Sequence, residues 1–489
     1  MGEPVRFPDV AVYTGFNQTV RAETDVRDLE VIEGAIPEAF EGTLYRVGPD
    51  PRYPARLGDD EWTNGDGHVV MFRFGDGHVD LKTRYVRTER LLLEEKARRS
   101  LFGRYRNTYT NDPSVAGAAN GTANTNVIWH GGKLLALKED SLPIELDPDT
   151  LATKGNWDYD GRMTARCMTA HPKLDTATGE LLSFSFQARG DCTTDFAYWV
   201  IDGNGKITHE TWFEAPYAGW VHDFAITEEH VVFPMTPMIT DPEVLKKGGP
   251  FYQYHPDKDY HFAVMPRYGT AADVRWFRGP SGSAGHMVNA FTEGTKVHLD
   301  ICLAEGVAVL PFIPNVDGTF PDPVPPQITR LTFDMKGNGD RYTKELLIRR
   351  PGEMPQTDPR YQGRPYRHAY FLALGPVGLD GAGLAHVDFA TGKEEAWDCG
   401  KGTTLHEPQF VARRPDAAEG DGWIVAIHDR RAEGHANLLI FDAQKVAAGP
   451  VATIRLPVRV RCTFHGTWVP EGALRTPEPS VAAAAKMTG

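Results

Sequence analysis

The chain has 489 residues, of which 41% are hydrophobic and 24% charged, a composition typical of a folded protein and not of a disordered one. A formal charge of −14 and an isoelectric point near 5.7 argue against nucleic acid or an anionic membrane surface as the main partner. No run approaches the roughly 18 apolar residues of a spanning helix, so we expect no stable membrane anchor.

The predicted elements are mostly short strands. Alternating apolar runs separated by glycine-rich turns are typical of an all-β protein built from hairpins, and the clearest runs are 69–74, 133–137, 196–201 and 423–427. Helical patterning is sparse, and its better candidates are 87–100 and 242–247. The proline-rich run 310–326 is predicted to be a long surface or lid loop.

Many four-stranded units over this length suggest a β-propeller, whose axis can collect residues from several blades. No repeat of fixed period is present, so the blade count does not follow from the pattern itself. No shift in composition marks a boundary, so we expect a single domain over 1–489, with an N-terminal arm at 1–28 and a loose tail at 470–489.

The cysteines point to a reducing compartment. They are odd in number, widely spaced and form no CxxC pair: Cys167, Cys192, Cys302, Cys399 and Cys462. We interpret them as reduced core residues of a cytoplasmic protein.

Histidines in apolar contexts are the strongest candidates for chemistry. The segment 220–226 alternates as a strand that places His222, Phe224 and Ile226 on one face. A lone inward histidine is more often a core residue that bonds a backbone group, whereas a metal ligand needs partners. The candidate partners are His171, His286 and His465, and the fold would have to bring four distant segments to one point.

Three glutamates could support such a metal site. An imidazole that binds metal through one nitrogen should give its other N–H to a carboxylate or a carbonyl. Glu139 follows an apolar strand, and Glu353 and Glu407 lie in proline-containing segments. Each of them alone is more typical of an ordinary surface residue.

Taken together, these residues resemble the carotenoid cleavage oxygenase family from about Leu29 to Trp468, and the segment 407–411, followed by 419–422, is close to the family pattern. The resemblance implies that the four histidines ligate a non-haem ferrous iron, Fe(2+), and that the three glutamates form its outer shell. It also implies a seven-bladed β-propeller capped by loops and short helices over the axial iron site.

The donor set suits iron. Four neutral imidazoles leave the metal its full charge, which three carboxylates can balance, and an octahedral ion keeps two open positions. Zinc is disfavoured because a structural zinc site closes with four ligands and a catalytic one usually keeps three. In related enzymes a threonine methyl group crowds one open position, and Thr125 matches it. Thr125 is equally typical of a strand residue beside a turn.

Within the family, the sequence looks most like bacterial lignostilbene dioxygenases and isoeugenol oxygenases, in segments 101–107, 138–140, 207–213 and 447–453. In the stilbene-cleaving members a tyrosine and a lysine hold the substrate's 4-hydroxyl, and Tyr105 and Lys138 match them. The lysine ammonium would stabilise a phenolate that pushes electrons onto the conjugated alkene. The stilbene enzymes tend to have a phenylalanine at the position of Thr63, so a stacking contact is either missing or supplied by Trp62.

We therefore expect an iron-dependent, cofactor-free oxygenase of dioxygenase type. It would cleave the exocyclic C=C bond of a small phenolic alkene (isoeugenol, 4-vinylguaiacol or a hydroxystilbene) with O2 to a 4-hydroxybenzaldehyde such as vanillin. The sequence does not decide between one-ring and two-ring substrates. An apocarotenoid cleavage dioxygenase is the alternative, which the mean hydropathy of −0.39 disfavours mildly. A non-catalytic propeller that binds partners is disfavoured because a scaffold has no need of the histidine–glutamate set.

Overall fold

The structure is a computed structural model that describes residues 5–58, 60–307, 312–375 and 378–474. Strands dominate it, so the prediction of an all-β protein is confirmed. In the described residues the strands form six sheets, here called sheets I to VI, with antiparallel pairing throughout.

Sheets I to III are built from strands of the first part of the sequence, except for the last strand of sheet I. Sheet I has the strand order β1 (Thr24–Val26), β5 (His78–Tyr85), β4 (Gly67–Gly75), β3 (Gly42–Pro49) and β32 (Gly466–Pro470). Sheet II contains β6 (Asn126–His130), β7 (Lys133–Leu137), β8 (Ile144–Leu146) and β9 (Thr153–Asn156). Sheet III contains β10 (Lys173–Asp175), β11 (Glu180–Phe186), β12 (Asp195–Ile201) and β13 (Ile207–Glu214).

Sheets IV to VI are larger. Sheet IV contains β14 (Gly219–Trp220), β15 (Ala225–Ile226), β16 (His230–Ile239), β17 (Gln253–Tyr254), β18 (Tyr260–Pro266) and β19 (Arg275–Gly279). Sheet V contains β20 (Ser283–Glu293), β21 (Lys296–Ala304), β22 (Gln327–Asp334), β23 (Thr343–Thr357), β24 (His368–Gly375), β25 (Gly378–Asp388) and β26 (Lys393–Trp397). Sheet VI contains β2 (Val31–Gly34), β31 (Pro450–Arg455), β30 (His435–Asp442), β29 (Gly422–Arg430), β27 (Thr404–Leu405) and β28 (Gln409–Ala412).

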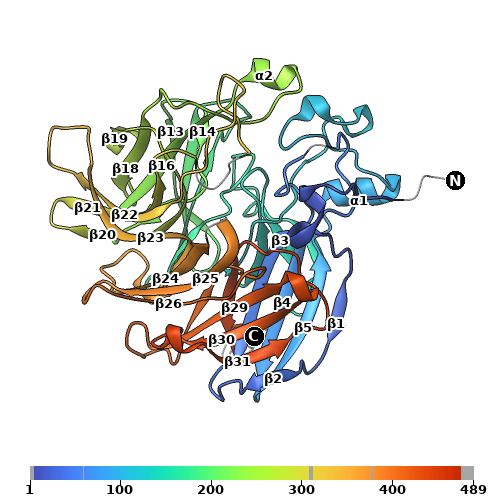
Figure 1. Ribbon diagram of the computed structural model, residues 1–489. Helices are drawn as coiled ribbons and strands as arrows, with labels where there is room; N and C mark the ends of the chain where they lie inside the picture. The colour runs from blue at the N-terminus through green and yellow to red at the C-terminus, as the bar shows by residue number, and fades with distance from the viewer. Residues whose placement is uncertain (1–4, 59, 308–311, 376–377, 475–489) are drawn as a thin grey trace, which may run out of the picture.

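Strands from the two ends of the sequence pair with each other at two places. The late strand β32 pairs with β3 in sheet I, and the early strand β2 pairs with β31 in sheet VI. The blue and red strands therefore lie side by side in Figure 1. Close approach explains the glycine at the start of β32, since a Cβ at Gly466 would lie 1.9 Å from the carbonyl oxygen of Tyr45.

The apolar core is divided among the spaces between successive sheets. Phe184 of sheet III packs against Phe233 of sheet IV with ring centroids 5.5 Å apart. A comparable cluster joins Val70 of sheet I to Leu438 of sheet VI, the first and last sheets. Alternating strand residues thus bury one face against each neighbouring sheet, which accounts for the long runs of buried positions in central strands.

Both predicted helices are present but shorter. Helix α1 (Glu89–Ala97) is capped by Thr88, whose hydroxyl accepts the Leu91 N–H at 3.1 Å, and α2 (Pro242–Lys246) starts with proline. No helix in the described part of the protein has the length and apolar character needed to cross a membrane.

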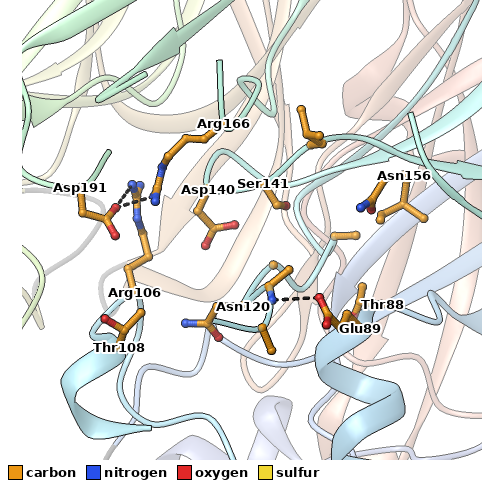
Figure 2. A pocket seen from close by; sticks show the side chains of 16 residues that line it. Thr88, Glu89, Arg106, Thr108, Asn120, Asp140, Ser141, Asn156, Arg166 and Asp191 are labelled. Atoms are coloured by element: carbon orange, nitrogen blue, oxygen red, sulfur yellow. Dashed lines mark hydrogen bonds and ion pairs between the residues drawn. The ribbon is translucent and has the colours of Figure 1, made fainter. Parts of the chain in front are cut away.

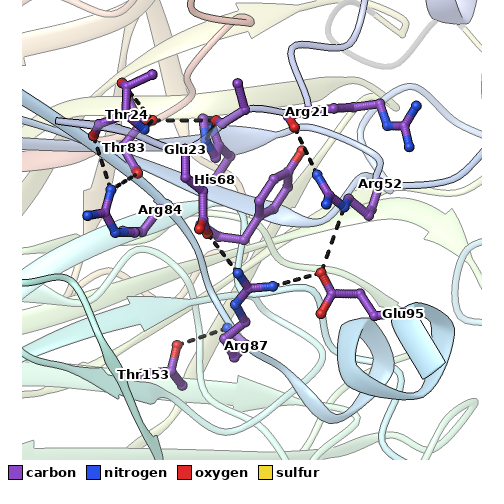
Figure 3. A network of polar contacts seen from close by, with 12 residues as sticks. Arg21, Glu23, Thr24, Arg52, His68, Thr83, Arg84, Arg87, Glu95 and Thr153 are labelled. Carbon is purple, nitrogen blue, oxygen red and sulfur yellow. Dashed lines mark hydrogen bonds and ion pairs between the residues drawn. The ribbon is translucent and has the colours of Figure 1, made fainter.

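The N-terminal arm is fastened to sheet I through β1 and by ion pairs. Figure 3 shows Arg87 between Glu23 of the arm, at 3.0 Å, and Glu95 of α1, at 2.7 Å. Arg52 also donates to the carbonyl of Arg21 at 2.8 Å. Residues 1–4 of the predicted arm, 310–311 of the predicted loop and 475–489 of the predicted tail lie outside the described residues.

Candidate metal centre and substrate cavity

The structure brings the four predicted histidines together. One ring nitrogen from each of His171, His222, His286 and His465 lies within 4.8 Å of the other three. The Nε2 atoms of His171 and His222 are 3.1 Å apart, and those of His286 and His465 are 3.2 Å apart. The histidines come from four different sheets, because they lie before β10, between β14 and β15, within β20 and before β32.

Irregularities in strand pairing direct some of the site's side chains towards the metal centre. The pairing register of β20 shifts between Ala284 and Met287, on either side of His286. The register of β23 shifts between Glu353 and Gln356, and Met354 has a positive φ of 52° there. A bulge turns a side chain out of its normal alternation, which is how both strands direct a residue into the site.

The predicted continuous strand over 220–226 is wrong. Strand β14 ends at Trp220 and β15 begins at Ala225, with no strand pairing between them. Asp223 holds the intervening segment in another shape, because its carboxylate accepts from the backbone N–H groups of Phe224 at 2.8 Å and Met287 at 2.9 Å. His222 reaches the other histidines and Phe224 packs in the core between sheets III and IV, so they do not share one face.

Each of the three predicted glutamates bonds one histidine. The Nδ1 atoms of His222, His286 and His465 lie 2.7 Å, 2.6 Å and 2.8 Å from carboxylate oxygens, which belong to Glu139, Glu353 and Glu407 respectively. All three glutamates are buried, so they are not ordinary surface residues. When Nδ1–H donates to a carboxylate, the tautomer leaves the Nε2 lone pair free to bind a metal.

The protonation states favour a bound cation. Burial opposes ionisation of Glu139, but its contact with His222 lowers its pKa to about 2. Burial also opposes ionisation of Glu407, whose pKa His465 and Arg46 lower to about 2. Burial, with the other histidines nearby, holds the pKa of His171 well below its ordinary value.

The pKa values of two further candidate ligands, His465 and His286, are shifted in opposite directions. Burial lowers the pKa of His465 to about 4, although Glu407 acts in the opposite direction. Burial acts the same way on His286, but Glu353 more than reverses it and the pKa is raised. The acidic carboxyl groups of Glu139 and Glu407, together with the weakly basic His171 and His465, therefore favour the binding of a cation.

The residues fit a metal ion. Four imidazole nitrogens converge, three carboxylates stand behind them, and buried Glu353 Oε1 has no hydrogen-bond partner among the described protein atoms. Imidazole donors suit iron, so these four histidines would hold it.

Sequence reasoning missed the residues that hold the glutamates. Buried Arg46 on β3 donates to Glu407 Oε2 at 2.6 Å, and Gln356 donates to Oε1 at 3.0 Å. Trp220 donates through Nε1 to Glu139 at 3.0 Å. These partners come from separate sheets, and their sequence contexts carry no sign of the contact.

A cavity of about 370 Å³ opens onto the histidines. It is lined by the predicted substrate residues Trp62, Thr63, Tyr105, Thr125 and Lys138, together with three of the histidines. Trp62 packs edge-on against Phe464 at 5.2 Å, so aromatic rings form a wall beside Thr63. Phe312, Ile313 and Pro326 of the predicted lid loop also line the cavity, as does Cys462, which is thus not the core residue that we expected.

Buried Asn124 links two of the predicted substrate residues. Its Oδ1 accepts from Lys138 Nζ at 3.1 Å and from the Thr125 hydroxyl at 3.0 Å, while its amide donates to the carbonyls of Thr63 and Gly65. Thr125 precedes β6 and lines the cavity, so the strand interpretation of this residue is wrong. The Lys138 ammonium lies 5.2 Å from the Tyr105 ring centroid, and the Tyr105 hydroxyl donates to Glu139 at 3.3 Å.

A second cavity, of about 290 Å³, lies across the turn that follows β7. Figure 2 shows Asp140 and Ser141 beside it, whereas the preceding Lys138 and Glu139 line the first cavity. Arg106 and Arg166 both pair with Asp191 there, at 2.8 Å and 2.5 Å. The turn 138–141 is thus the wall between the two cavities.

Comparisons with known proteins agree with this arrangement. The family model described as retinal pigment epithelial membrane protein (RPE65) matches residues 17–470. The protein is 41% identical to lignostilbene-alpha,beta-dioxygenase isozyme III of Sphingomonas paucimobilis, with 94% of this chain and 97% of that one covered. It is 41% identical to isoeugenol monooxygenase of Pseudomonas nitroreducens, with 92% and 96% covered.

A solved structure is similar over its full length. The crystal structure of Pseudomonas brassicacearum lignostilbene dioxygenase superposes with a TM-score of 0.92 at 45% identity, with 96% of this chain and 100% of that one covered. The family is known to use non-haem iron, which fits the four-histidine group. The chain belongs to the RPE65 / carotenoid cleavage oxygenase family.

Proposed function

We propose that this protein is an Fe(2+)-dependent oxygenase that cleaves the exocyclic C=C bond of 4-hydroxyphenyl alkenes with O2. The products would be a 4-hydroxybenzaldehyde, such as vanillin, and a second carbonyl compound. One observation carries the proposal: Lys138 and Tyr105, suited to a phenol, line the same cavity as three histidines of the metal group. Lignostilbene and isoeugenol, named in two relatives, are both phenolic alkenes.

His171, His222, His286 and His465 would hold the iron, and Glu139, Glu353 and Glu407 would orient three of these imidazoles. When bound, the iron would supply the one-electron chemistry that allows O2 to react with a closed-shell alkene. Thr125, with its hydroxyl held by Asn124, would narrow the space beside the metal with its methyl group.

The protein's own groups would act mainly at the phenol. The Lys138 ammonium would stabilise negative charge on the 4-oxygen, and this charge delocalises through the ring into the alkene. Trp62 and Phe464 would flank the ring and exclude water from it. The cavity is at the small end of the range for ligand pockets, which suits one or two rings better than a long polyene. This favours phenolic alkenes over the apocarotenoid alternative.

The fold proposal is a seven-bladed propeller within a single domain over 1–489. Sheet V would divide into two blades at β23, whose first half pairs with β22 and whose second half pairs with β24. An apolar cluster between the halves, around Cys302 and Phe371, supports the division. Each blade would then contribute one residue of the metal site, in sequence order Glu139, His171, His222, His286, Glu353, Glu407 and His465.

A cap of loops and short helices would cover the axial site. Tyr105 follows α1 and Tyr252 follows α2, and both side chains line the cavity with the lid loop. A cytoplasmic location stays a prediction.

A substrate panel tests the proposed function. Purified protein with iron should release aldehyde from 4-hydroxylated propenyl, vinyl and stilbene compounds and should fail with their 4-methoxy analogues. A methyl ether has no proton to lose, so it cannot become the anion that Lys138 stabilises. Equal cleavage of the methoxy compounds, or cleavage of an apocarotenal alone, would contradict the proposal. Labelled O2 distinguishes the dioxygenase type, because both oxygen atoms should then appear in the products.

A further inference from the structure

Glu61 places a carboxyl group at the phenol end of the cavity. It lies between β3 and β4 and lines the cavity with Lys138 and Tyr105. Its Oε2 accepts from the Thr63 hydroxyl at 3.3 Å. The neighbouring Asp60 has a structural task, since its carboxylate accepts from the backbone of Tyr105 at 3.0 Å and from the amide of Asn64 at 2.5 Å.

The other two carboxylates in the described lining of this cavity have oxygens that are already hydrogen-bonded or enclosed by protein. Glu139 accepts from Trp220, His222 and Tyr105. Glu353 holds His286, and its second oxygen is enclosed by protein. Among the described residues that line the cavity, this leaves Glu61 as the carboxyl group with an oxygen available to a ligand.

Glu61 and Lys138 do not form an ion pair among the contacts of the described residues, although their charges influence one another. Both side chains line one cavity without touching, so a phenol bound in that cavity could contact both of them. The 4-oxygen of a phenol can donate its proton to one and accept from the other.

We propose that Glu61 is the catalytic residue that takes the proton from the substrate's 4-hydroxyl; this inference rests on the proposed function. The phenol O–H bond breaks, an O–H bond forms on the Glu61 carboxylate, and the electron pair stays on the 4-oxygen beside the Lys138 ammonium. Net charge in the cavity is unchanged, so the transfer avoids the cost of burying an additional ion. No oxidant or reductant is needed for this step.

The electrostatics agree with this assignment. Burial and the charge of Asp60 raise the pKa of Glu61 to about 8, against the opposing effect of Lys138. A base works best when its pKa lies near the operating pH, and such a value approaches the roughly 10 of a phenol. The charged groups that act on Glu61 are Asp60 on its own segment and Lys138 and Glu139 after β7. The other titratable groups that line the same cavity are Tyr105, Tyr252, Glu353, Cys462, His222, His286 and His465. Glu61 also lines a small second cavity with Tyr13, Tyr53, Asp66, Arg90, Glu94 and Arg461.

The test compares Glu61→Gln and Glu61→Asp with wild type and with Glu228→Gln, an exposed control that does not line the substrate cavity. Glutamine keeps the size of the side chain and can still accept from Thr63, so we expect normal folding and iron content. For the wild type, kcat/KM on a 4-hydroxyphenyl alkene should rise with pH and level off above about 8. Glu61→Gln should lower kcat/KM on the order of 100-fold at pH 8 and recover only near pH 10, where the substrate ionises in solution. Glu61→Asp should retain the wild-type shape of the pH profile.

A second readout does not depend on turnover. A 4-hydroxystilbene bound without O2 should show the long-wavelength absorption of its phenolate in wild type at pH 8.5, and the phenol spectrum in Glu61→Gln. If both proteins show the phenolate band and the same pH profile, Glu61 does not take the proton. If wild-type protein cleaves none of the 4-hydroxylated compounds, the proposed function fails instead, so the two failures are distinct.

Discussion

Replacing Glu407 by Gln should destabilise the protein far more than the same replacement at Glu353, although both glutamates hold a histidine. Glu407 is also the counter-ion of Arg46, at 2.6 Å, and both side chains are almost fully buried, with exposed fractions of 6% and 2%. Glu353 accepts from His286 and from the backbone N–H of Met354, and it forms no pair with Arg or Lys in the described structure.

The size of the destabilisation follows from the buried guanidinium of Arg46, which loses its counter-ion in Glu407→Gln. Removing one partner of a buried ion pair costs about 3–5 kcal/mol. Against the effect of burial, His465 and then Arg46 lower the pKa of Glu407 to about 2, which is the direction expected when both neighbours stabilise the carboxylate. At Glu353 the amide oxygen of Gln can still accept from His286, so only the charge assistance of that hydrogen bond is lost, at a cost of about 1 kcal/mol.

Urea denaturation of the iron-free proteins measures the difference. We expect a clearly lower midpoint for Glu407→Gln than for Glu353→Gln, and recovery of the midpoint in the double variant Arg46→Met, Glu407→Gln. Both single variants should bind iron about ten- to a hundredfold more weakly, because each removes the partner of an imidazole N–H. Equal midpoints for the two single variants would refute the role of the Arg46 ion pair.

Three further outcomes are expected. Wild-type protein should contain about one iron per protein molecule in metal analysis. His465→Ala should lose this iron, because three imidazoles bind it more weakly than four. Stoichiometric zinc, together with alkene cleavage that survives iron removal, would contradict this prediction. Lys138→Met should keep its iron but lose about 1.5–3 kcal/mol of transition-state stabilisation, so kcat/KM on isoeugenol should fall about 10- to 100-fold, and undiminished turnover would count against the phenolate. Burial lowers the pKa of His406 from 6.5 to about 3, so the unfolded protein binds an additional proton between these values and stability falls as pH falls from 6.5 towards 3. His406→Gln should reduce that loss relative to wild type in denaturation midpoints at pH 7 and pH 4, whereas an identical loss in both proteins would assign the acid sensitivity to other groups.

The predictions from sequence succeeded where a residue's local pattern determines its structure. Alternation and glycine turns predicted the all-β architecture, and helical patterning over 87–100 located α1. The segment 220–226 failed because period-two alternation cannot show that Asp223 bonds the backbone of Met287, 64 residues further along the sequence.

The supporting residues of the site were not predictable for the same reason. Arg46 and Glu407 are 361 residues apart in sequence, and an arginine in a strand is usually an exposed edge residue. Asn124 lies beside other asparagines in a context that indicates only a turn, yet it bonds Lys138 and Thr125 at once. Contacts of this kind depend on how the sheets meet, which no short stretch of sequence encodes.

The position of His465 has a consequence for biosynthesis. This residue lies directly before β32, and its backbone N–H donates to the carbonyl of Thr125 while its carbonyl accepts from Val47. The four-histidine set is therefore incomplete on the ribosome until residue 465 has left the exit tunnel, by which time most sheets have already been synthesised. Metal binding by all four histidines therefore has to follow synthesis of residue 465, and a prematurely terminated product without β32 lacks both the fourth imidazole and the strand that completes sheet I.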